Sequence, residues 1–378
     1  MKREKQLSIK RLKKLCRKIK DPRRRWGNKR HELTDILIII LLAIICGCET
    51  WEEIRDYGVT KKEWLQTFLS LRNGIPCQAT FRRVMEKLKP KHLEKVYRKW
   101  VRAYVGSCLY KQICVDGKTV CGVNRRSDEM LHMVSAWVRE DGISLGQVKV
   151  AEKSSEITAI PNLVDALDIS GSVVSIDAMG CQKDIAKKII ENEANYVLAV
   201  KLNQPTLYEE IKAYFDWARV DPIEKKHLDV YKETTFDHGR TVTYTTFMTT
   251  DVIWFEGIKD WQALRSFILV ERVRTEKNTT STEQAFFISS LQTDAKHCSH
   301  IVRGHWSVEN QLHWMLDVAF HEDACAVHTG YAPQNLSLLR KMALACIKKD
   351  TFVNASVARK QKLAGWNNDF ALHFLQLV

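Results

Sequence analysis

The segment HWSVENQLHW, which begins at His305, places several side chains with chemical potential at helical spacing. Residues four apart lie on one face of a helix, so His305, Glu309 and His313 are expected to share a face, with Trp306 and Leu312 beside them to anchor the helix. The carboxylate can bind a metal ion, and the imidazoles can contact phosphate or orient water. The spacing also suggests zinc, but histidines at positions i and i+8 rarely converge on one tetrahedral ion. We therefore expect Glu309 to be an oxygen ligand that a helix supplies.

Two aspartates can supply further carboxylates. Asp116 follows the apolar residues ICV, Asp177 follows VVSI, and a small residue comes directly after each. Acids at strand ends beside small residues are typical of binding sites, although one such Asp taken alone is more often a turn former. If the two strands are neighbours, the adjacent anions repel each other unless a cation neutralises them. Oxygen ligands favour a hard divalent ion, most naturally Mg²⁺.

The elements that would position these acids alternate between strands and helices, which predicts an α/β fold with a mixed sheet covered by helices. A β-rich segment then interrupts this unit before a helical stretch resumes. The expected elements are three strands within 111–152, a helix near 161–167, a strand at 172–179, a helix over 181–193, a strand at 195–201, a β-rich segment at 222–292 with a hairpin turn at 275–280, and helices from about 297.

The charge of the chain is concentrated at its N-terminus. Residues 1–30 hold fifteen Lys or Arg against two acids, a net charge of +13, while the whole chain carries +14. A basic arm on a near-neutral body is typical of polyanion binding, because each neutralised phosphate releases condensed counterions. A solvated solubilising tail is the alternative. The candidate DNA contacts in this arm are Arg23, Arg24 and Arg25.

Residues 31–105 have the pattern of a helical domain. The apolar run from Ile36 to Cys48 is too short to cross a bilayer, so it predicts a buried helix over 34–46, capped by Thr34 or Asp35. Short helices joined by tight turns follow it, and they are equally compatible with a helix-turn-helix and with an ordinary helical bundle. The eleven scattered cysteines contain no Cys-x-x-Cys, which favours reduced thiols in the cytoplasm and argues against a zinc site.

Several motifs in the same order resemble the DDE transposases with a ribonuclease H-like catalytic domain. Within that class the sequence is similar to the H-repeat-associated (ISAs-type) insertion-sequence transposases, and the WEEIRDYG region also fits that branch. The matching stretches are VDGKTV at 115–120, LGQVKV-x₂-KSSEI-x₂-IP at 145–161, SIDAMGCQ at 175–182, NYVLAVKLNQ at 195–204, DHGR at 237–240 and R-G-HW-x₂-EN-x-LHW-x-LDV-x-F-x-ED at 303–323.

The resemblance implies three metal-binding catalytic acids at Asp116, Asp177 and Glu309, with two Mg²⁺ ions for which Mn²⁺ can substitute. It implies a basic arm (1–30), a helical N-terminal domain (31–107), a catalytic domain (108–350) with its β-rich insertion at about 222–292, and a C-terminal helical tail (351–378). The residues expected to contact DNA are Lys118, Lys201, Asn203, Gln204, His238, Arg240, Arg303 and His305.

One departure from the broader family concerns the residues around the last acid. The relatives carry Tyr-x₂-Arg-x₃-Glu-x₆-Lys, where this chain has Val302, His305, Glu309 and Leu316. The residue whose positive charge binds the scissile phosphate is therefore undecided, and the candidates are Arg303, Lys201 and His305.

The expected function is DNA transposition, with DNA as partner and a homodimer in the DNA complex. Metal-assisted hydrolysis would free a 3′-hydroxyl at the element's end, and the same site would join it to target DNA. No Gly-x₄-Gly-Lys-Ser/Thr loop is present, so no nucleoside triphosphate is expected to be used. The alternatives are a nuclease of the same fold that does not join ends and a DNA-binding regulator without catalysis.

Overall fold

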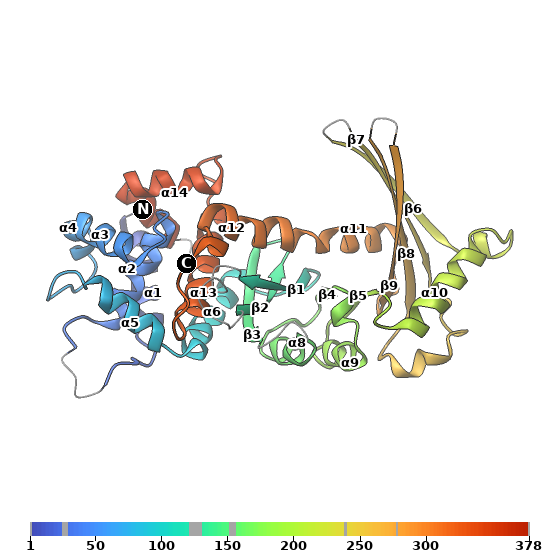
Figure 1. Cartoon of the computed structure of the whole chain (residues 1–378), viewed down its shortest axis with the longest axis horizontal. Coiled ribbons are helices and arrows are strands. Elements are labelled where there is room, and N and C mark those ends of the chain that lie inside the picture. Colours follow the sequence, from blue (N-terminus) through green and yellow to red (C-terminus); the bar gives the residue numbers. More distant parts are fainter. Residues whose placement is uncertain are drawn as a thin grey trace.

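A computed structural model describes residues 2–24, 29–120, 131–150, 156–237, 240–276 and 279–376. The molecule is elongated, as Figure 1 shows: a helical body lies at one end, a sheet with covering helices lies in the middle, and a blade of long strands projects at the other end. The N-terminal and C-terminal helices share the same helical body, so the chain leaves this body, builds the sheet and returns to it.

The middle of the molecule is a mixed sheet whose strands follow the order β3-β2-β1-β4-β5. Strand β1 is antiparallel to β2 and parallel to β4, and β4 is parallel to β5. This is the ribonuclease H-like arrangement, which confirms the expected fold class. The strands are β1 (Gln112–Val120), β2 (Leu131–Val138), β3 (Ile143–Val150), β4 (Val173–Ile176) and β5 (Asn195–Val200).

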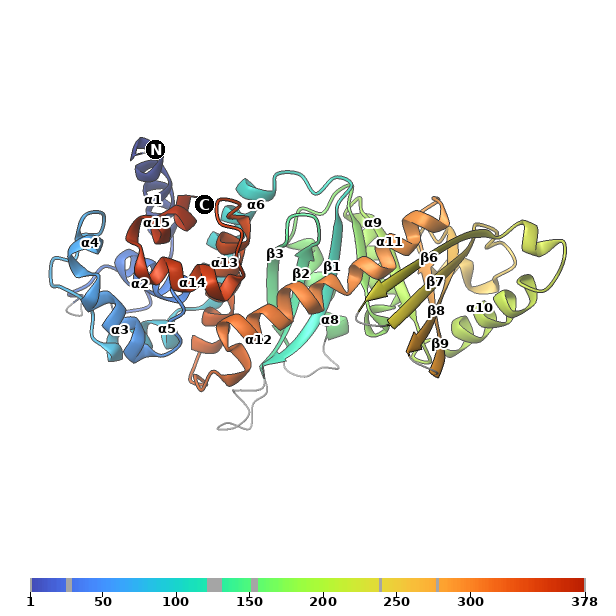
Figure 2. The same cartoon turned by 90° about the horizontal axis from the view of Figure 1, so that it is seen from above.

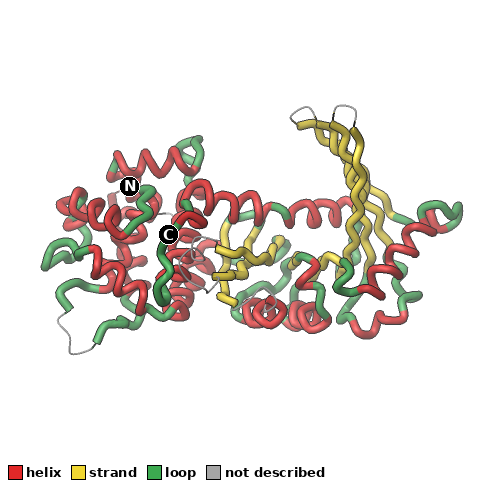
Figure 3. The backbone as a smooth tube through the Cα atoms, viewed as in Figure 1, coloured by secondary structure: helices red, strands yellow, loops and turns green. Residues whose placement is uncertain are grey.

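The β-rich segment extends the same sheet instead of forming a separate one. Strand β9 pairs antiparallel with β5, so the sheet continues to nine strands and its outer four form the blade (Figure 3). The expected hairpin near 275–280 is confirmed by the pairing of Glu276 with Thr279, whose connecting residues lie outside the described part. The blade strands are β6 (Asp229–Asp237), β7 (Arg240–Thr249), β8 (Ser266–Glu276) and β9 (Thr279–Ser289).

A helix that our sequence analysis missed, α10 (Pro205–Ala218), connects the middle of the sheet to the blade. Pro205 lies in its first turn, where the missing N–H costs nothing. Leu207, Ile211 and Phe215 are buried at a spacing of four, so the helical pattern was present in the sequence.

Helices cover the two faces of the sheet. In Figure 1, α8 (Glu156–Asp165) and α9 (Lys183–Glu191) lie on one face, and α11 (Ala295–His305) and α12 (Trp314–Phe320) cross the other. Helix α8 begins before the expected position and contains Pro161 in its interior. Figure 2 shows α11 and α12 running as one nearly continuous rod from the blade across β1 to the helical body.

The helical body combines the first and last parts of the chain around α2, all of whose residues are buried. The expected cap of α2 is wrong: the helix begins after Glu32, and Asp35 instead accepts a hydrogen bond from the backbone N–H of Leu71 (3.2 Å). The helices are α1 (Lys2–Cys16), α2 (Leu33–Ile45), α3 (Trp51–Thr60), α4 (Lys62–Gln66), α5 (Gln78–Lys87), α6 (Pro90–Val105), α13 (Ala332–Lys349), α14 (Val357–Trp366) and α15 (Asn368–Gln376).

Half of the expected basic arm belongs to this core. Helix α1 buries Ile9, Leu12 and Cys16 and packs against α15 and α2. A free arm would leave these apolar side chains in water, so the region 1–30 is a docked helix followed by a basic segment. Within the described residues, no helix combines the length and the apolar character needed to cross a membrane.

Candidate active site

The sheet places Asp116 and Asp177 at the same level on neighbouring strands. The parallel pairing of β1 with β4 ends at Val115 and Ile176, and each aspartate is the next residue along its strand. Asp116 is partly buried and Asp177 is exposed. Asp177 precedes the short helix η2 (Ala178–Gly180), and its Oδ1 accepts a hydrogen bond from the N–H of Gly180 (3.4 Å). The strands that carry the two aspartates are therefore neighbours, which meets the condition under which the adjacent anions repel each other.

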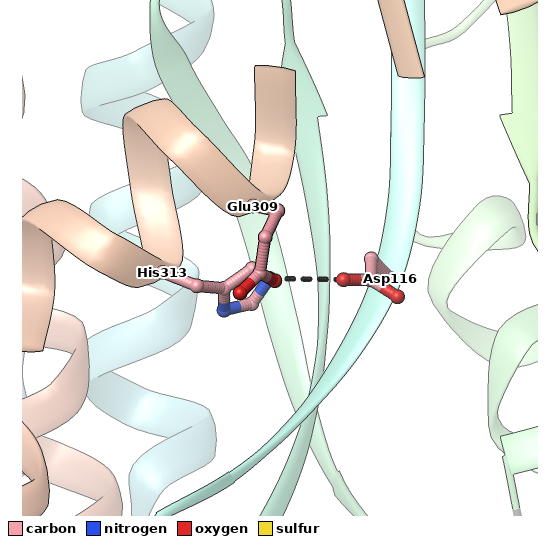
Figure 4. Close-up of side chains that lie close together, drawn as sticks. All are labelled: Asp116, Glu309 and His313. Atoms are coloured by element: carbon pink, nitrogen blue, oxygen red, sulfur yellow. Dashed lines mark ion pairs between the residues drawn. The ribbon is translucent and has the colours of Figure 1, made fainter. Parts of the chain in front are cut away.

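Glu309 and His313 meet Asp116 from the opposite side. One ligand atom from each of the three residues lies within 4.8 Å of the other two, and Nε2 of His313 lies 3.3 Å from Oδ2 of Asp116 (Figure 4). Glu309 is exposed and His313 is buried. Two carboxylates and an imidazole at this separation can hold one divalent cation. Asp177 does not fall within this group in the described structure; it stands beside it on β4.

The helix that carries Glu309 is interrupted at the site. Helix α11 ends at His305, and Glu309 and His313 are the first and last residues of a π-helical turn, η5 (Glu309–His313). A π-helical turn thus replaces the expected α-helical one, but the expectation that His305, Glu309 and His313 share a face is confirmed, because all three lie close to Asp116. Turns of this kind are frequent at functional sites. Leu312 is buried as expected, but Trp306 is about half exposed (51%) and does not anchor the helix.

Polar contacts fix α11 to the sheet just before the site. Nε2 of Gln112 donates to the carbonyl of Ile301 (2.7 Å), and Arg139 donates to the carbonyl of His300 (3.0 Å). Gly304 allows this close approach, because a Cβ there would overlap the Arg139 guanidinium and the Gln112 amide. These contacts determine how far the following turn, and Glu309 with it, lies from β1.

Burial and the two histidines shift the pKa values of groups in the site. Burial raises the pKa of Asp116, but the neighbouring His313 and His305 outweigh that effect and hold the pKa below its usual value. For His305, burial dominates over the nearby aspartates and lowers the pKa, and its Nδ1 lies 3.0 Å from Oγ of Ser175. Burial therefore favours the neutral form of His305, which argues against it as the cation that binds phosphate.

Asn203 and Gln204, two of the expected DNA contacts, instead hold the turn after Asp177. The Asn203 side chain donates to the carbonyl of Ala178 (2.6 Å), and the Gln204 side chain donates to the carbonyl of Cys181 (2.9 Å). Their amide groups thereby fix the backbone that carries the second aspartate. The geometry favours a positioning role for both residues.

Lys118 is also engaged within the protein. Its ammonium pairs with Asp317 and lies 3.7 Å from a carboxylate oxygen of Glu322 and of Asp323. Glu322 is itself buried, with Arg340 at 3.8 Å. The side chain of Lys118 is 12% exposed. We conclude that Lys118 joins β1 to the chain after α12, and this placement does not favour contact with DNA.

The remaining candidate DNA contacts divide into exposed and paired cations. Lys201 and Arg24 are exposed. Arg240 pairs with Glu276 in the blade (3.1 Å), and Arg303 pairs with Glu233 and lies over the ring of Tyr244 (4.5 Å). The last three expected contacts are Arg23, which pairs with Asp21 (2.8 Å), and Arg25 and His238, which lie outside the described residues.

Comparison with known proteins identifies the family of this chain. Residues 108–346 match the family described as Transposase DDE domain, and residues 14–101 match the family described as DDE_Tnp_1-associated. The chain belongs to the DDE transposase family. It is 36% identical to the putative transposase YncI of Escherichia coli O157:H7, over 91% of this chain and 89% of that protein.

Two further similarities concern an H-repeat relative and a solved structure. The transposase is 32% identical to the H repeat-associated putative transposase YhhI of Escherichia coli strain K12, over 93% of this chain and 94% of that protein. This confirms the resemblance drawn from the motifs. A piggyBac transposase synaptic complex with hairpin DNA matches with a TM-score of 0.47 at 11% identity, covering 97% of this chain and 80% of that chain.

One acid beside the site of this transposase was not among the predicted site residues. Glu156 of α8 is buried against Nε2 of His132, whose Nδ1 lies 2.8 Å from Oγ1 of Thr119. Gly117 leaves the room that the Glu156 carboxylate occupies. Burial raises the pKa of Glu156, and the nearby Asp177 and Asp116 add to this effect. The KSSEI motif contained this residue, but nothing in its spacing pointed to β1.

Proposed function

We propose that this transposase cleaves DNA at the ends of its element by hydrolysis and joins the freed 3′ end to target DNA. The observation that carries the proposal is the convergence of Asp116 and Glu309, which come from distant parts of the chain, within 4.8 Å. Asp177 stands next to Asp116 on the neighbouring strand. Family membership supports DNA as the substrate.

The donor set fits a pair of divalent cations. Asp116, Asp177 and Glu309 would hold them. Such cations would offset the repulsion between the carboxylates, and Lys118 on the same strand is already paired with Asp317. Oxygen ligands are those that Mg²⁺ prefers, and Mn²⁺ accepts the same set. When bound, the ions would lower the pKa of water and offset the negative charge of the phosphate.

The side chains would then align two successive displacements at phosphorus. In the first, the oxygen of a water attacks the scissile phosphate, the bond to the 3′ oxygen breaks, and that oxygen leaves as a hydroxyl after taking up a proton. In the second, the freed hydroxyl attacks a target phosphodiester and expels a new 3′ oxygen. Asn203 and Gln204 would hold Asp177 in place for both steps, because they fix the turn that follows it.

DNA would reach the site along exposed cations. One candidate is Lys201, which directly follows β5. Another is Arg24, which follows the docked helix α1. Arg240 lies in the blade, where a long duplex leaving the site could contact it. Joining of two element ends requires two active sites, so we propose a homodimer on DNA.

The experiment uses a plasmid that carries both ends of the element, incubated with the full chain and Mg²⁺. We expect cleavage and joining by the wild type and a loss of at least about 1,000-fold in Asp177→Asn, because a ligand carboxylate is removed. Asp251→Asn, at an exposed site, is the matched control. Wild-type activity in Asp177→Asn would contradict the proposal.

Two other outcomes separate the alternatives. Cleavage without joining, even with a pre-cut 3′ end, would indicate a nuclease. Binding of the element ends with no cleavage in either Mg²⁺ or Mn²⁺ would indicate a regulator.

A further inference from the structure

The imidazole of His313 lies in the candidate site without the hydrogen bonds that a buried side chain ordinarily makes. The residue is 3% exposed, and neither Nδ1 nor Nε2 has a hydrogen-bond partner among the described residues. Most buried polar atoms in proteins have such a partner, so an exception calls for an explanation. Two carboxylates lie close to it among the described residues: Asp116, whose Oδ2 is 3.3 Å from Nε2, and Glu309.

Two ordinary explanations fit this geometry poorly. A structural core histidine would lose its hydrogen bonds to water on burial and receive none from the protein, which destabilises the fold. A histidine that only orients Asp116 would be expected to donate a hydrogen bond of about 2.7–2.9 Å with good alignment. The contact to Asp116 is longer than that, and its orientation does not satisfy hydrogen-bond geometry.

The third explanation is that the nitrogen faces a cation. Ligands of one ion lie about 2.0–2.3 Å from it, which separates the ligand atoms from one another by about 3–4.5 Å. Atoms of His313, Asp116 and Glu309 lie within 4.8 Å of one another, so a small adjustment would bring them into one coordination sphere. The π-helical turn that begins at Glu309 and ends at His313 presents both side chains toward β1 (Figure 4).

We propose that His313 is a direct ligand of the ion held by Asp116 and Glu309, so that this position has a mixed oxygen and nitrogen donor set. This inference rests on the proposed function and deepens it. Mg²⁺ strongly prefers oxygen, whereas imidazole suits the later divalent metals, and Mn²⁺, the first metal of that series, takes oxygen ligands and accepts nitrogen more readily than Mg²⁺. The Asp116–Glu309–His313 position therefore prefers Mn²⁺ to Mg²⁺, and the preference comes from His313.

The test is pulsed electron paramagnetic resonance of Mn²⁺ bound to the full chain, together with Mn²⁺ and Mg²⁺ titrations. We expect the wild type to show coupling of Mn²⁺ to a coordinated imidazole nitrogen, and [¹⁵N]histidine labelling to change that signal. His313→Gln should lose the coupling and bind Mn²⁺ about tenfold more weakly, while its affinity for Mg²⁺ changes by less than about threefold. If His313→Gln does not fold, His313→Ala replaces it in the test. The [¹⁵N]histidine-labelled wild type tests nitrogen coordination without any substitution.

His305→Gln is the control, because His305 lies beside the same acids and contacts Ser175. It should keep the nitrogen coupling. Mn²⁺ bound without nitrogen coupling, or coupling lost in His305→Gln and kept in His313→Gln, would overturn the role of His313 and leave the proposed function intact. Absence of any bound Mn²⁺, together with no metal-dependent cleavage, would overturn both.

Discussion

Two polar clusters lie two residues apart on β1 and differ in how their charges are balanced. At Asp116, two carboxylates and a buried imidazole face one another, and the imidazole has no hydrogen bond within the described chain. At Lys118, the ammonium pairs with carboxylates, and the buried Glu322 lies between Lys118 and Arg340. Like charges held close together repel each other, so the cluster without an internal cation is the candidate site for a bound one.

The balanced cluster has a structural task. Lys118 and Glu322 join β1 to the segment after α12, and Lys341 of α13 is buried with its ammonium bonded to Ser135 and Gln147. Burial lowers the pKa of Lys341 to about 8. The comparison teaches that acids gathered around one strand can have different roles, and that the presence of an internal cation distinguishes the structural cluster from the candidate site.

The largest expected effect is the loss of activity in Asp116→Asn. Cleavage of a plasmid carrying the element ends should fall by at least about 1,000-fold, because the amide no longer offers an anionic ligand. The melting temperature without metal should stay close to that of the wild type, since removing one of several like charges relieves repulsion. A variant that cleaves normally, or that does not fold, would remove the distinction between the two clusters.

In the cluster around Lys118, a substitution is expected to lower stability. Glu322→Gln should lower the free energy of unfolding by about 3 kcal/mol, because it leaves the positive charges of Arg340 and Lys118 without their buried partner. Urea denaturation followed by circular dichroism measures this value. Glu63→Gln, at an exposed site in α4, should change it by less than about 0.5 kcal/mol. Equal stability of the two variants would show that the cluster is not structural.

The pH dependence of stability tests whether Glu322 is charged in the folded protein. Burial raises the pKa of Glu322, but Arg340, Lys118 and Lys341 outweigh it and hold the pKa below its usual value. A depressed pKa contributes stability that is present above the ordinary Glu pKa, about 4.3, and that is lost as the pH falls through the folded-state value. The stability difference between wild type and Glu322→Gln should therefore shrink as the pH is lowered from 6 through this range. A constant difference would contradict the assigned charge.

A smaller effect is expected where α11 meets the sheet. Gly304→Ala should lower cleavage about tenfold, because the added methyl group displaces Arg139 and Gln112 and shifts the turn that carries Glu309. The free energy of unfolding should fall by only about 1 kcal/mol, since both displaced groups are flexible side-chain ends. Gly365→Ala is the matched control: a Cβ at this helical glycine would make only ordinary van der Waals contacts with Cys46. Equal activities of the two variants would show that the docking distance does not matter.

The smallest effect is expected for Asn203→Ala. Loss of its hydrogen bond to the carbonyl of Ala178 should loosen the turn after Asp177 and lower the cleavage rate a few-fold, with little change in DNA affinity. A gel-shift titration beside the cleavage assay separates the two quantities. A large loss of DNA binding with normal cleavage of bound DNA would instead return Asn203 to the group of DNA contacts.

The sequence predicted the fold class and left the adjacency of the strands that carry Asp116 and Asp177 as a condition. The fold class follows from short-range patterns: apolar strands that end in an acid, and an order of elements that restricts which strands are adjacent. The segment 222–292 was recognised as β-rich for the same reason. Its attachment to β5 depends on edge pairing between distant segments, which no local pattern encodes.

The side-chain partners could not be predicted in this way. The ion pair of Lys118 with Asp317 and the amide contacts of Asn203 form between residues that only the tertiary structure brings together. The π-helical turn at Glu309 is also not predicted by regular α-helical spacing. The burial of His313 is likewise a result of packing, so the difference between a catalytic and a structural polar group became visible only with the fold.

The most direct test of the account is the position of bound metal in crystals of the full chain with element-end DNA and Mn²⁺, located by anomalous scattering. The account predicts two peaks about 3.5–4 Å apart, both in contact with Asp116, one also in contact with Asp177 and the other with Glu309. Peaks that lie away from Asp116, or DNA bound in place with no peak near these acids, would contradict it.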